Sequence, residues 1–349
     1  MSWQCIRGHE QWVEAFNHAV QRGRLAHAYL FVGPSGIGKR LFAGELAKAL
    51  LCEGHSGGKL EACDKCPACI LVEAGTHPDF FTNPRPWLDE EGKKEVNEFP
   101  IHLMRELCAG FALKSARGRG KVAILDDADD LSAESANCFL KTLEEPPPRS
   151  VFVLIGTRPD LQFLTVVSRC QIVRFAPLHE SAVIELLLKN GVEDRAQATR
   201  LARLSGGSPG QALALADPEL WKFRGLLLEG LSRPRPDSVS LAKAWTEFVE
   251  EAGKETASQR RRAGVVLRLL IEFLNDALAL SLGKSPKLAD PEDLPLLQQL
   301  SQRLGSDRLL GLLDRCLEAE FHLDRYVQLV LVLEGLLDAL GQELVRSGA

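Results

Sequence analysis

The sequence lacks three features that would place it in a membrane, on an export route or on nucleic acid by charge alone. Its most apolar stretch, residues 263–283, is too polar for a membrane span because it contains Arg268, Glu272, Asn275 and Asp276. The N-terminal segment mixes charged and apolar side chains, unlike a secretory signal. The net charge of −5 gives no overall basic surface. We therefore expect a cytoplasmic chain without membrane contact, whose contacts with nucleic acid are local or made within a larger assembly.

Apolar runs alternate with helical patterns over the first half of the chain. Short apolar runs bounded by turn residues are typical of buried strands. Strands separated by helical segments predict a parallel sheet with helices on its faces. The expected strands are residues 28–32, 122–125, 151–155 and 172–175.

The character of the sequence changes after Pro177, where helical periodicity replaces the strand pattern. We expect an α/β domain at residues 1–177, a small helical domain at residues 178–217 and a larger all-helical domain at residues 218–349. Residues 84–100, with their prolines and mixed charge, predict an exposed loop.

A glycine-rich segment, GPSGIGKR, follows the first expected strand and precedes a helical pattern. Gly33, Gly36 and Gly38 allow a tight turn whose N–H groups surround a phosphate, and Lys39 would reach the outer phosphates of ATP or ADP. The complete motif ends in a hydroxyl residue that ligates Mg²⁺, but Arg40 has no lone pair to offer. Mg²⁺ binding and hydrolysis are therefore in doubt, and a ligand-free turn between strand and helix is the alternative.

An acidic segment, LDDADD, ends the second expected strand. Asp126 stands where a carboxylate would hold Mg²⁺, and Asp127 stands where a glutamate would normally polarise water. An aspartate is one methylene shorter, so it reaches a water molecule less well. The alternative is that these residues only decorate the exposed end of a strand.

Four of the nine cysteines crowd into a short insert after the phosphate-loop helix. Cys52, Cys63, Cys66 and Cys69 have the spacing C-x10-C-x2-C-x2-C. Four thiolates suit a closed, structural Zn²⁺ site that leaves no position for water. The alternative is four unligated thiols.

An arginine precedes the last expected strand, in the segment VVSRCQIVRF. At the rim of a sheet, Arg169 could cross a subunit interface and stabilise charge on a neighbour's γ-phosphate. A solvated surface arginine without such a role is the alternative.

These features resemble the bacterial clamp-loader AAA+ family and, within it, the delta-prime type of DNA polymerase III holoenzyme subunit. The combination of the four-cysteine insert with the SRC segment is specific to this family, whereas the phosphate loop is not. The resemblance is dense over residues 25–215 and thin afterwards. It rests on the order and spacing of HAYLFVGPSGIGK, the cysteine insert, ANCFLKTLEEPPPRSVFVLIG, SRCQ and GGSPGQAL.

The resemblance implies a RecA-like P-loop module, a helical lid and a helical collar that joins five subunits. It also implies that gamma or tau subunits hydrolyse ATP, that delta opens the sliding clamp and that delta-prime is a rigid stator. The SRC arginine of the family acts in trans, which maps onto Arg169. Contacts with the clamp and primed DNA would be made through the complex, and the chain would carry no polymerase chemistry of its own.

Three departures distinguish the chain from the ATP-hydrolysing branch. Arg40 and Asp127 are two, and the third is the lid segment 206–213, which contains no basic residue. They favour a stator with weak or absent ATPase activity, while Lys39 leaves passive nucleotide binding open. The alternatives are an active gamma/tau-like ATPase and a DNA-binding protein that uses the cysteine insert, whose only strong bases are Lys59 and Lys65.

Overall fold

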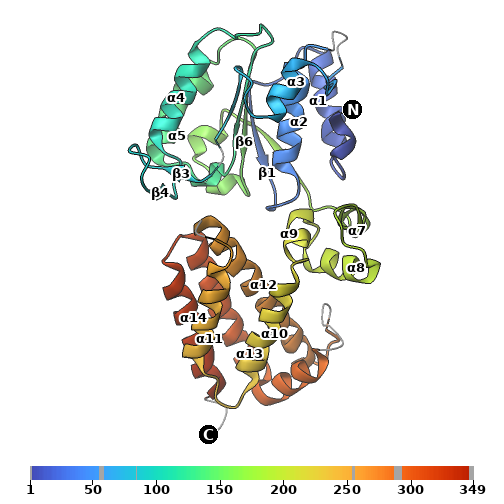
Figure 1. Cartoon of the computed structure of the whole chain (residues 1–349), viewed down its shortest axis with the longest axis vertical. Coiled ribbons are helices and arrows are strands. Elements are labelled where there is room, and N and C mark those ends of the chain that lie inside the picture. The colour runs from blue at the N-terminus through green and yellow to red at the C-terminus, as the bar shows by residue number, and fades with distance from the viewer. Residues whose placement is uncertain (1, 55–58, 84, 254–255, 287–292, 346–349) are drawn as a thin grey trace. The chain divides into compact units, whose positions relative to one another are not determined.

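The computed structural model contains two compact units, Met1–Ala212 and Leu213–Ala349. It describes residues 2–54, 59–83, 85–253, 256–286 and 293–345. The first unit is an α/β structure and the second is helical throughout its described residues (Figure 1).

A five-stranded parallel sheet forms the centre of the first unit, in the order β2-β5-β6-β1-β7. Four of its strands confirm the sequence prediction to within one residue at each end. The fifth strand, β2, was not predicted because it is only three residues long. The strands are β1 (Ala28–Val32), β2 (Phe80–Thr82), β5 (Lys121–Leu125), β6 (Ser150–Ile155) and β7 (Gln171–Arg174).

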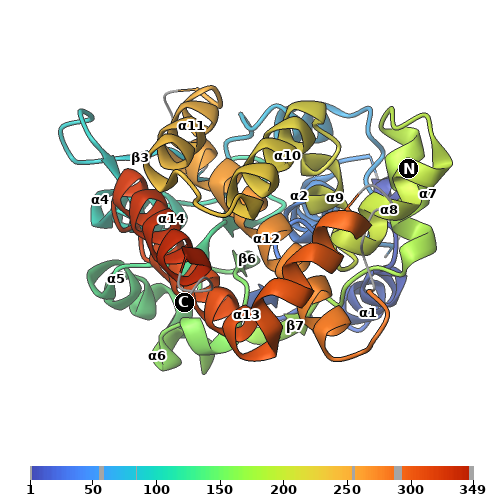
Figure 2. The same cartoon turned by 90° about the horizontal axis from the view of Figure 1, so that it is seen from below.

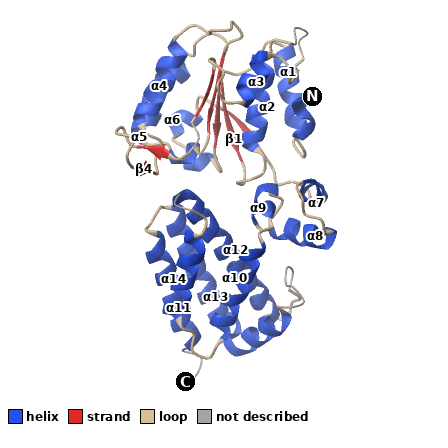
Figure 3. Cartoon of the chain, in the orientation of Figure 1, coloured by secondary structure: helices blue, strands red, loops and turns tan. Residues whose placement is uncertain are grey.

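Helices cover both faces of this sheet, as Figures 1 and 3 show. On one side lie α1 (Glu10–Gln21), α2 (Lys39–Leu51) and α3 (Pro67–Glu73), and on the other lie α4 (Ile101–Ala112) and α5 (Ala133–Glu144). The short helix α6 (Leu164–Val167) precedes β7. The small helices α7 (Glu180–Lys189), α8 (Arg195–Leu204) and α9 (Pro209–Ala214) follow it. The predicted α/β architecture is confirmed.

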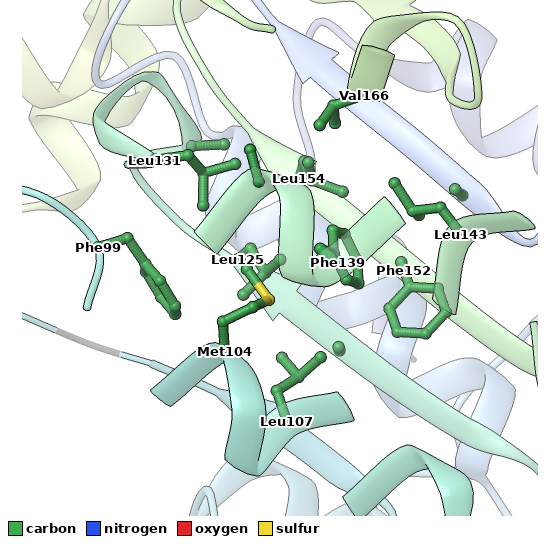
Figure 4. Close-up of a cluster of buried hydrophobic side chains, with 14 of the residues drawn as sticks. Phe99, Met104, Leu107, Leu125, Leu131, Phe139, Leu143, Phe152, Leu154 and Val166 are labelled. Carbon is green, nitrogen blue, oxygen red and sulfur yellow. The ribbon is translucent and has the colours of Figure 1, made fainter. Parts of the chain in front are cut away.

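A hydrophobic cluster joins α4, α5 and α6 to the sheet (Figure 4). Phe139 and Leu143 of α5 pack with Phe152 of β6, and each of the three is at most 1% exposed. Close packing of aromatic and aliphatic side chains fixes the helices on the strands. The ends of α5 and α6 are therefore held rigidly against the sheet, and so are the residues that immediately follow them.

The segment after β2 differs from the exposed loop that was predicted for residues 84–100. Among its described residues, β3 (Trp87–Leu88) pairs antiparallel with β4 (Glu95–Val96). Trp87 is 2% exposed and packs edge-on against Phe99 at 5.2 Å between ring centroids. Most of the other described residues in the segment are exposed, as predicted, and the prediction missed only the short strand pair and the two buried aromatic anchors, Trp87 and Phe99. Pro84 lies outside the described residues.

The second unit consists of long helices, as predicted. Helix α12 packs on α13, and α14 contacts both α11 and α13 (Figure 2). None of the helices in the described part of the chain has the length and apolarity that crossing a bilayer demands. The helices are α10 (Pro218–Ser232), α11 (Ser238–Glu250), α12 (Thr256–Ser281), α13 (Leu294–Asp324) and α14 (Leu329–Val345).

Candidate functional site

The phosphate loop connects the carboxyl end of β1 to the first residue of α2, Lys39. Gly33, Gly36 and Gly38 all adopt positive φ, so the backbone has the turn that the motif predicts. At Gly36, with φ of 77°, a Cβ atom would lie 2.7 Å from Ser208 Oγ and 3.2 Å from Gly210 Cα. Glycine is therefore needed there for backbone conformation and for space.

Lys39 is turned back onto the loop that precedes it. Its Nζ donates hydrogen bonds to the carbonyl oxygens of Gly33 at 2.5 Å and Pro34 at 2.8 Å. The residue is 7% exposed, and burial lowers the pKa of its ammonium group although the nearby Asp129 opposes the shift. In this arrangement at least two of the three N–H hydrogens of the Lys39 ammonium group are used in hydrogen bonds to loop carbonyl oxygens.

The start of α9 lies directly against the phosphate loop, within the first unit. Ser208 Oγ donates a 2.8 Å hydrogen bond to Ser35 O, and Gly210 N donates a 2.9 Å hydrogen bond to Gly36 O. Backbone and hydroxyl groups of the segment GGSPGQAL, which contains no basic residue, thus pack on the loop. The contact links the small helices directly to the P-loop.

Replacing Gly36 by alanine is expected to destabilise the first unit by about 1–3 kcal/mol, because it combines positive φ with a collision at Ser208 and Gly210. Gly38→Ala is the matched control: φ is 98°, but a Cβ atom there would meet no atom within 4 Å among the described residues. Urea unfolding should show a larger loss for Gly36→Ala. Equal losses would contradict the tight contact between loop and α9.

Arg40 pairs with the acidic residue that would otherwise hold a metal ion. Its Nη1 lies 2.8 Å from Asp126 Oδ2, across the space between the first turn of α2 and the end of β5. The guanidinium places a positive charge beside the carboxylate that Mg²⁺ would need, and it has no lone pair to coordinate a metal. The residues present therefore do not fit Mg²⁺.

A second arginine, which the sequence did not single out, neutralises the next acidic residue. Arg85 Nε lies 2.7 Å from Asp127 Oδ2, and its Nη2 pairs with Asp130. The same guanidinium stacks 3.9 Å from the centroid of the Trp87 ring. Asp127 has a left-handed backbone conformation with φ of 52°, and its carboxylate is paired with Arg85.

The four cysteines of the insert come together as predicted by their spacing. One sulfur atom from each of Cys52, Cys63, Cys66 and Cys69 lies within 4.8 Å of the others. Two of the pairs, Cys52–Cys66 and Cys63–Cys69, have sulfur atoms 4.0 Å apart. A tetrahedral ion with bonds of about 2.3 Å would separate its thiolates by about 3.8 Å. The residues therefore fit a Zn²⁺ ion.

Backbone N–H groups within the cluster point at its sulfur atoms. Cys66 N donates to Cys63 Sγ at 3.3 Å, and Cys69 N donates to Cys66 Sγ at 3.5 Å. Burial opposes ionisation of Cys66, yet hydrogen bonds led by the one from Cys69 lower the pKa of its thiol to about 6. These hydrogen bonds favour the thiolate form of Cys66, the form that binds metal, whereas burial raises the pKa of the Cys69 thiol.

Lys48 ties this cysteine turn to the phosphate-loop helix. Its Nζ lies 3.0 Å from Glu45 Oε1 and 3.1 Å from Asp64 Oδ1, and its side chain is 10% exposed. Asp64 follows Cys63 directly and has φ of 57°. These acidic groups raise the pKa of Lys48 although its burial opposes the shift. Sequence reasoning could not find this network, because its members belong to no motif.

Arg169 lies between α6 and β7, at the rim of the sheet. Its Nη1 donates to Thr165 O at 2.7 Å and to Ser168 Oγ at 3.3 Å, while Nη2 forms an ion pair with Glu144 at the end of α5. The side chain is 31% exposed. Nε and one Nη2 hydrogen have no partner among the described residues, so the guanidinium retains donors for an external ligand.

The structure brings the predicted residues into three groups. The phosphate-loop residues, Arg40 and the acidic pair gather at the carboxyl ends of β1 and β5. The cysteines form a separate cluster between the end of α2 and α3. Arg169 lies apart from both groups in the sequence, in the short segment between α6 and β7. Both of the expected metal-side carboxylates in the loop group are paired with arginines.

Comparison with known proteins agrees with this architecture. Residues 8–179 match the family model described as "DNA polymerase III, delta subunit", and residues 218–340 match "DNA polymerase III, delta subunit, C terminal". DNA polymerase III subunit delta' of Escherichia coli is 32% identical over 84% of this chain and 82% of its own length. The Pseudomonas aeruginosa subunit delta' is 36% identical over 64% of this chain and 67% of its own length.

A tau subunit also aligns with part of this chain. DNA polymerase III subunit tau of E. coli is 33% identical over 61% of this chain but only 32% of its own length. The parallel sheet with its phosphate loop, followed by helices, confirms the predicted fold class: an α/β P-loop module of the AAA+ type with a helical C-terminal region. On these sequence matches and this fold, the chain belongs to the family of DNA polymerase III delta' subunits.

Proposed function

We propose that this chain is the stator subunit of a bacterial clamp loader. It assembles with gamma or tau and with delta subunits, and as part of that complex it helps to load a sliding clamp onto primed DNA. It hydrolyses little or no ATP itself and supplies Arg169 to the ATP site of a neighbouring subunit. Membership of the delta' family supports the role, and the Arg40–Asp126 ion pair is the observation that carries the inactive site.

The site of this chain is unsuited to hydrolysis for electrostatic reasons. Phosphoryl transfer needs a divalent cation to neutralise charge on the transferred group and a carboxylate to orient the attacking water. Here the carboxylate of Asp126 forms an ion pair with Arg40, and the carboxylate of Asp127 forms an ion pair with Arg85. ATP or ADP could still be held passively by the loop N–H groups once Lys39 leaves its carbonyl partners.

Arg169 has the properties expected of an arginine finger. It is held at a rim by backbone and side-chain partners, it keeps donors free, and a guanidinium is well suited to the oxygens of a phosphate. In this proposal the neighbour provides nucleotide and Mg²⁺, and Arg169 stabilises the charge that develops on the γ-phosphate.

We also assign structural Zn²⁺ to the cysteine cluster and a three-part organisation to the chain. The ion would be held by all four thiolates and would supply folding energy rather than catalysis. Residues 1–177 would act as the AAA+ module, residues 178–217 as the lid and residues 218–349 as the collar that joins neighbouring subunits.

The isolated subunit is expected to show no ATP hydrolysis above that of Lys39→Ala. The reason is that both metal-side carboxylates, Asp126 and Asp127, are paired with arginines. Release of radiolabelled phosphate from ATP, measured with Mg²⁺ and DNA present, tests this. Turnover that disappears in Lys39→Ala would instead identify the chain as an active ATPase of the gamma or tau type.

A further inference from the structure

Arg169 makes an ion pair that its own sequence motif does not account for. Its Nη2 contacts Oε1 of Glu144, a residue 25 positions earlier in the chain. Its Nη1 is held independently by Thr165 O at 2.7 Å. The guanidinium is therefore fixed from two directions, by a backbone carbonyl on its own segment and by a carboxylate on a different helix.

The position of Glu144 is electrostatically unfavourable without this partner. It is the last residue of α5, where the helix dipole is negative and basic residues are preferred. Glu145 follows it and adds a second negative charge. A carboxylate at this place does not stabilise the helix, and its ion-pair partner among the described residues is Arg169.

Both members of the pair stand on well-anchored elements. Leu143, the neighbour of Glu144, and Val166, three residues before Arg169, belong to the same buried cluster and are 1% and 0% exposed (Figure 4). Helix α5 is further fixed at its start by Ser132, whose hydroxyl caps Ser135 N. The carboxylate is thus presented to the guanidinium by a rigid frame, which is what positioning a functional group requires.

We propose that Glu144 is a positioning residue for Arg169. It holds one edge of the guanidinium and leaves Nε and one Nη2 hydrogen directed to other partners, so that the arginine meets a neighbour's phosphate already oriented. The inference rests on the proposed function of Arg169 in trans. Glu144 touches neither nucleotide nor Mg²⁺ in this proposal and acts only through Arg169.

The test uses the full chain reconstituted with its own ATP-hydrolysing partner subunits. Glu144→Gln keeps the size of the side chain and removes its charge, and Glu145→Gln is the matched control, since Glu145 forms no ion pair within the described residues. For Glu144→Gln, kcat of DNA-stimulated hydrolysis should fall about threefold to fivefold, which corresponds to an exposed ion pair. KM should stay unchanged, any change in thermal stability should be small, and Glu145→Gln should behave as the wild type.

A double variant separates positioning from other effects. In an Arg169→Ala background, Glu144→Gln should cause no further loss, because its target is gone. If Glu144→Gln matches Glu145→Gln while Arg169→Ala still lowers hydrolysis, the positioning role is rejected and the proposed function stands. A full additional loss in the double variant rejects the positioning role as well. If Arg169→Ala has no effect, both are rejected.

Discussion

Replacing Arg169 by alanine lowers ATP hydrolysis at the neighbouring site by about 10³-fold, if the guanidinium acts as an arginine finger. The expected loss is large because the finger stabilises charge that is present mainly in the transition state. Single-turnover hydrolysis by the reconstituted complex, with primed DNA and clamp present, measures it. The variant subunit should still fold and retain its metal, because the Arg169 side chain is partly exposed and far in sequence from the cysteines.

Arg158→Ala is the matched control for this prediction. Arg158 also belongs to the segment between β6 and β7, but its side chain is 65% exposed and pairs only loosely with Asp160 at 3.4 Å. Its loss should leave the single-turnover rate unchanged. An Arg169→Ala complex that assembles normally and hydrolyses ATP at the wild-type rate would remove the proposed role.

The double variant Cys63→Ser, Cys66→Ser is expected to lose about one equivalent of Zn²⁺. A closed site of four thiolates cannot hold the ion with two serine hydroxyls in their place. The stabilisation that the metal supplies is large, since structural sites in zinc-finger peptides bind with roughly 10–16 kcal/mol at pH 7. Metal analysis of the purified protein and thermal unfolding with and without chelator measure the two consequences.

Two other cysteines provide the control for the metal assignment. Cys108 and Cys138 are partly buried against the hydrophobic cluster of the first unit, outside the four-cysteine group. The variant Cys108→Ser, Cys138→Ser should retain the full equivalent of Zn²⁺. Retention of that equivalent in the Cys63→Ser, Cys66→Ser variant would refute the assignment.

Most of the sheet could be predicted because its strands are continuous apolar runs between glycine-rich or proline-rich turns. The phosphate loop and the cysteine cluster were also predictable, since both depend on the spacing of residues within a single segment. The pairing of β3 with β4 was not, because Trp87 and Phe99 are buried by contacts that compensate for a polar, proline-containing stretch.

The charge arrangement of the site could be predicted only in part. Arg40 was visible as a departure from a motif, but its ion pair with Asp126 joins positions 86 residues apart. The Arg85–Asp127 pair spans 42 residues and the Arg169–Glu144 pair spans 25. Such pairs depend on how strands and helices are packed, and one sequence carries no periodicity or spacing that would reveal them.

The central claim is that this chain contributes an arginine to a neighbour's nucleotide and does not hydrolyse its own. The most direct measurement compares ATP hydrolysis by two reconstituted complexes, one carrying Lys39→Ala in this chain and the other carrying Arg169→Ala. We predict a wild-type rate for the Lys39→Ala complex and loss of hydrolysis at one neighbouring site for the Arg169→Ala complex. Loss with Lys39→Ala and a normal rate with Arg169→Ala would contradict the account.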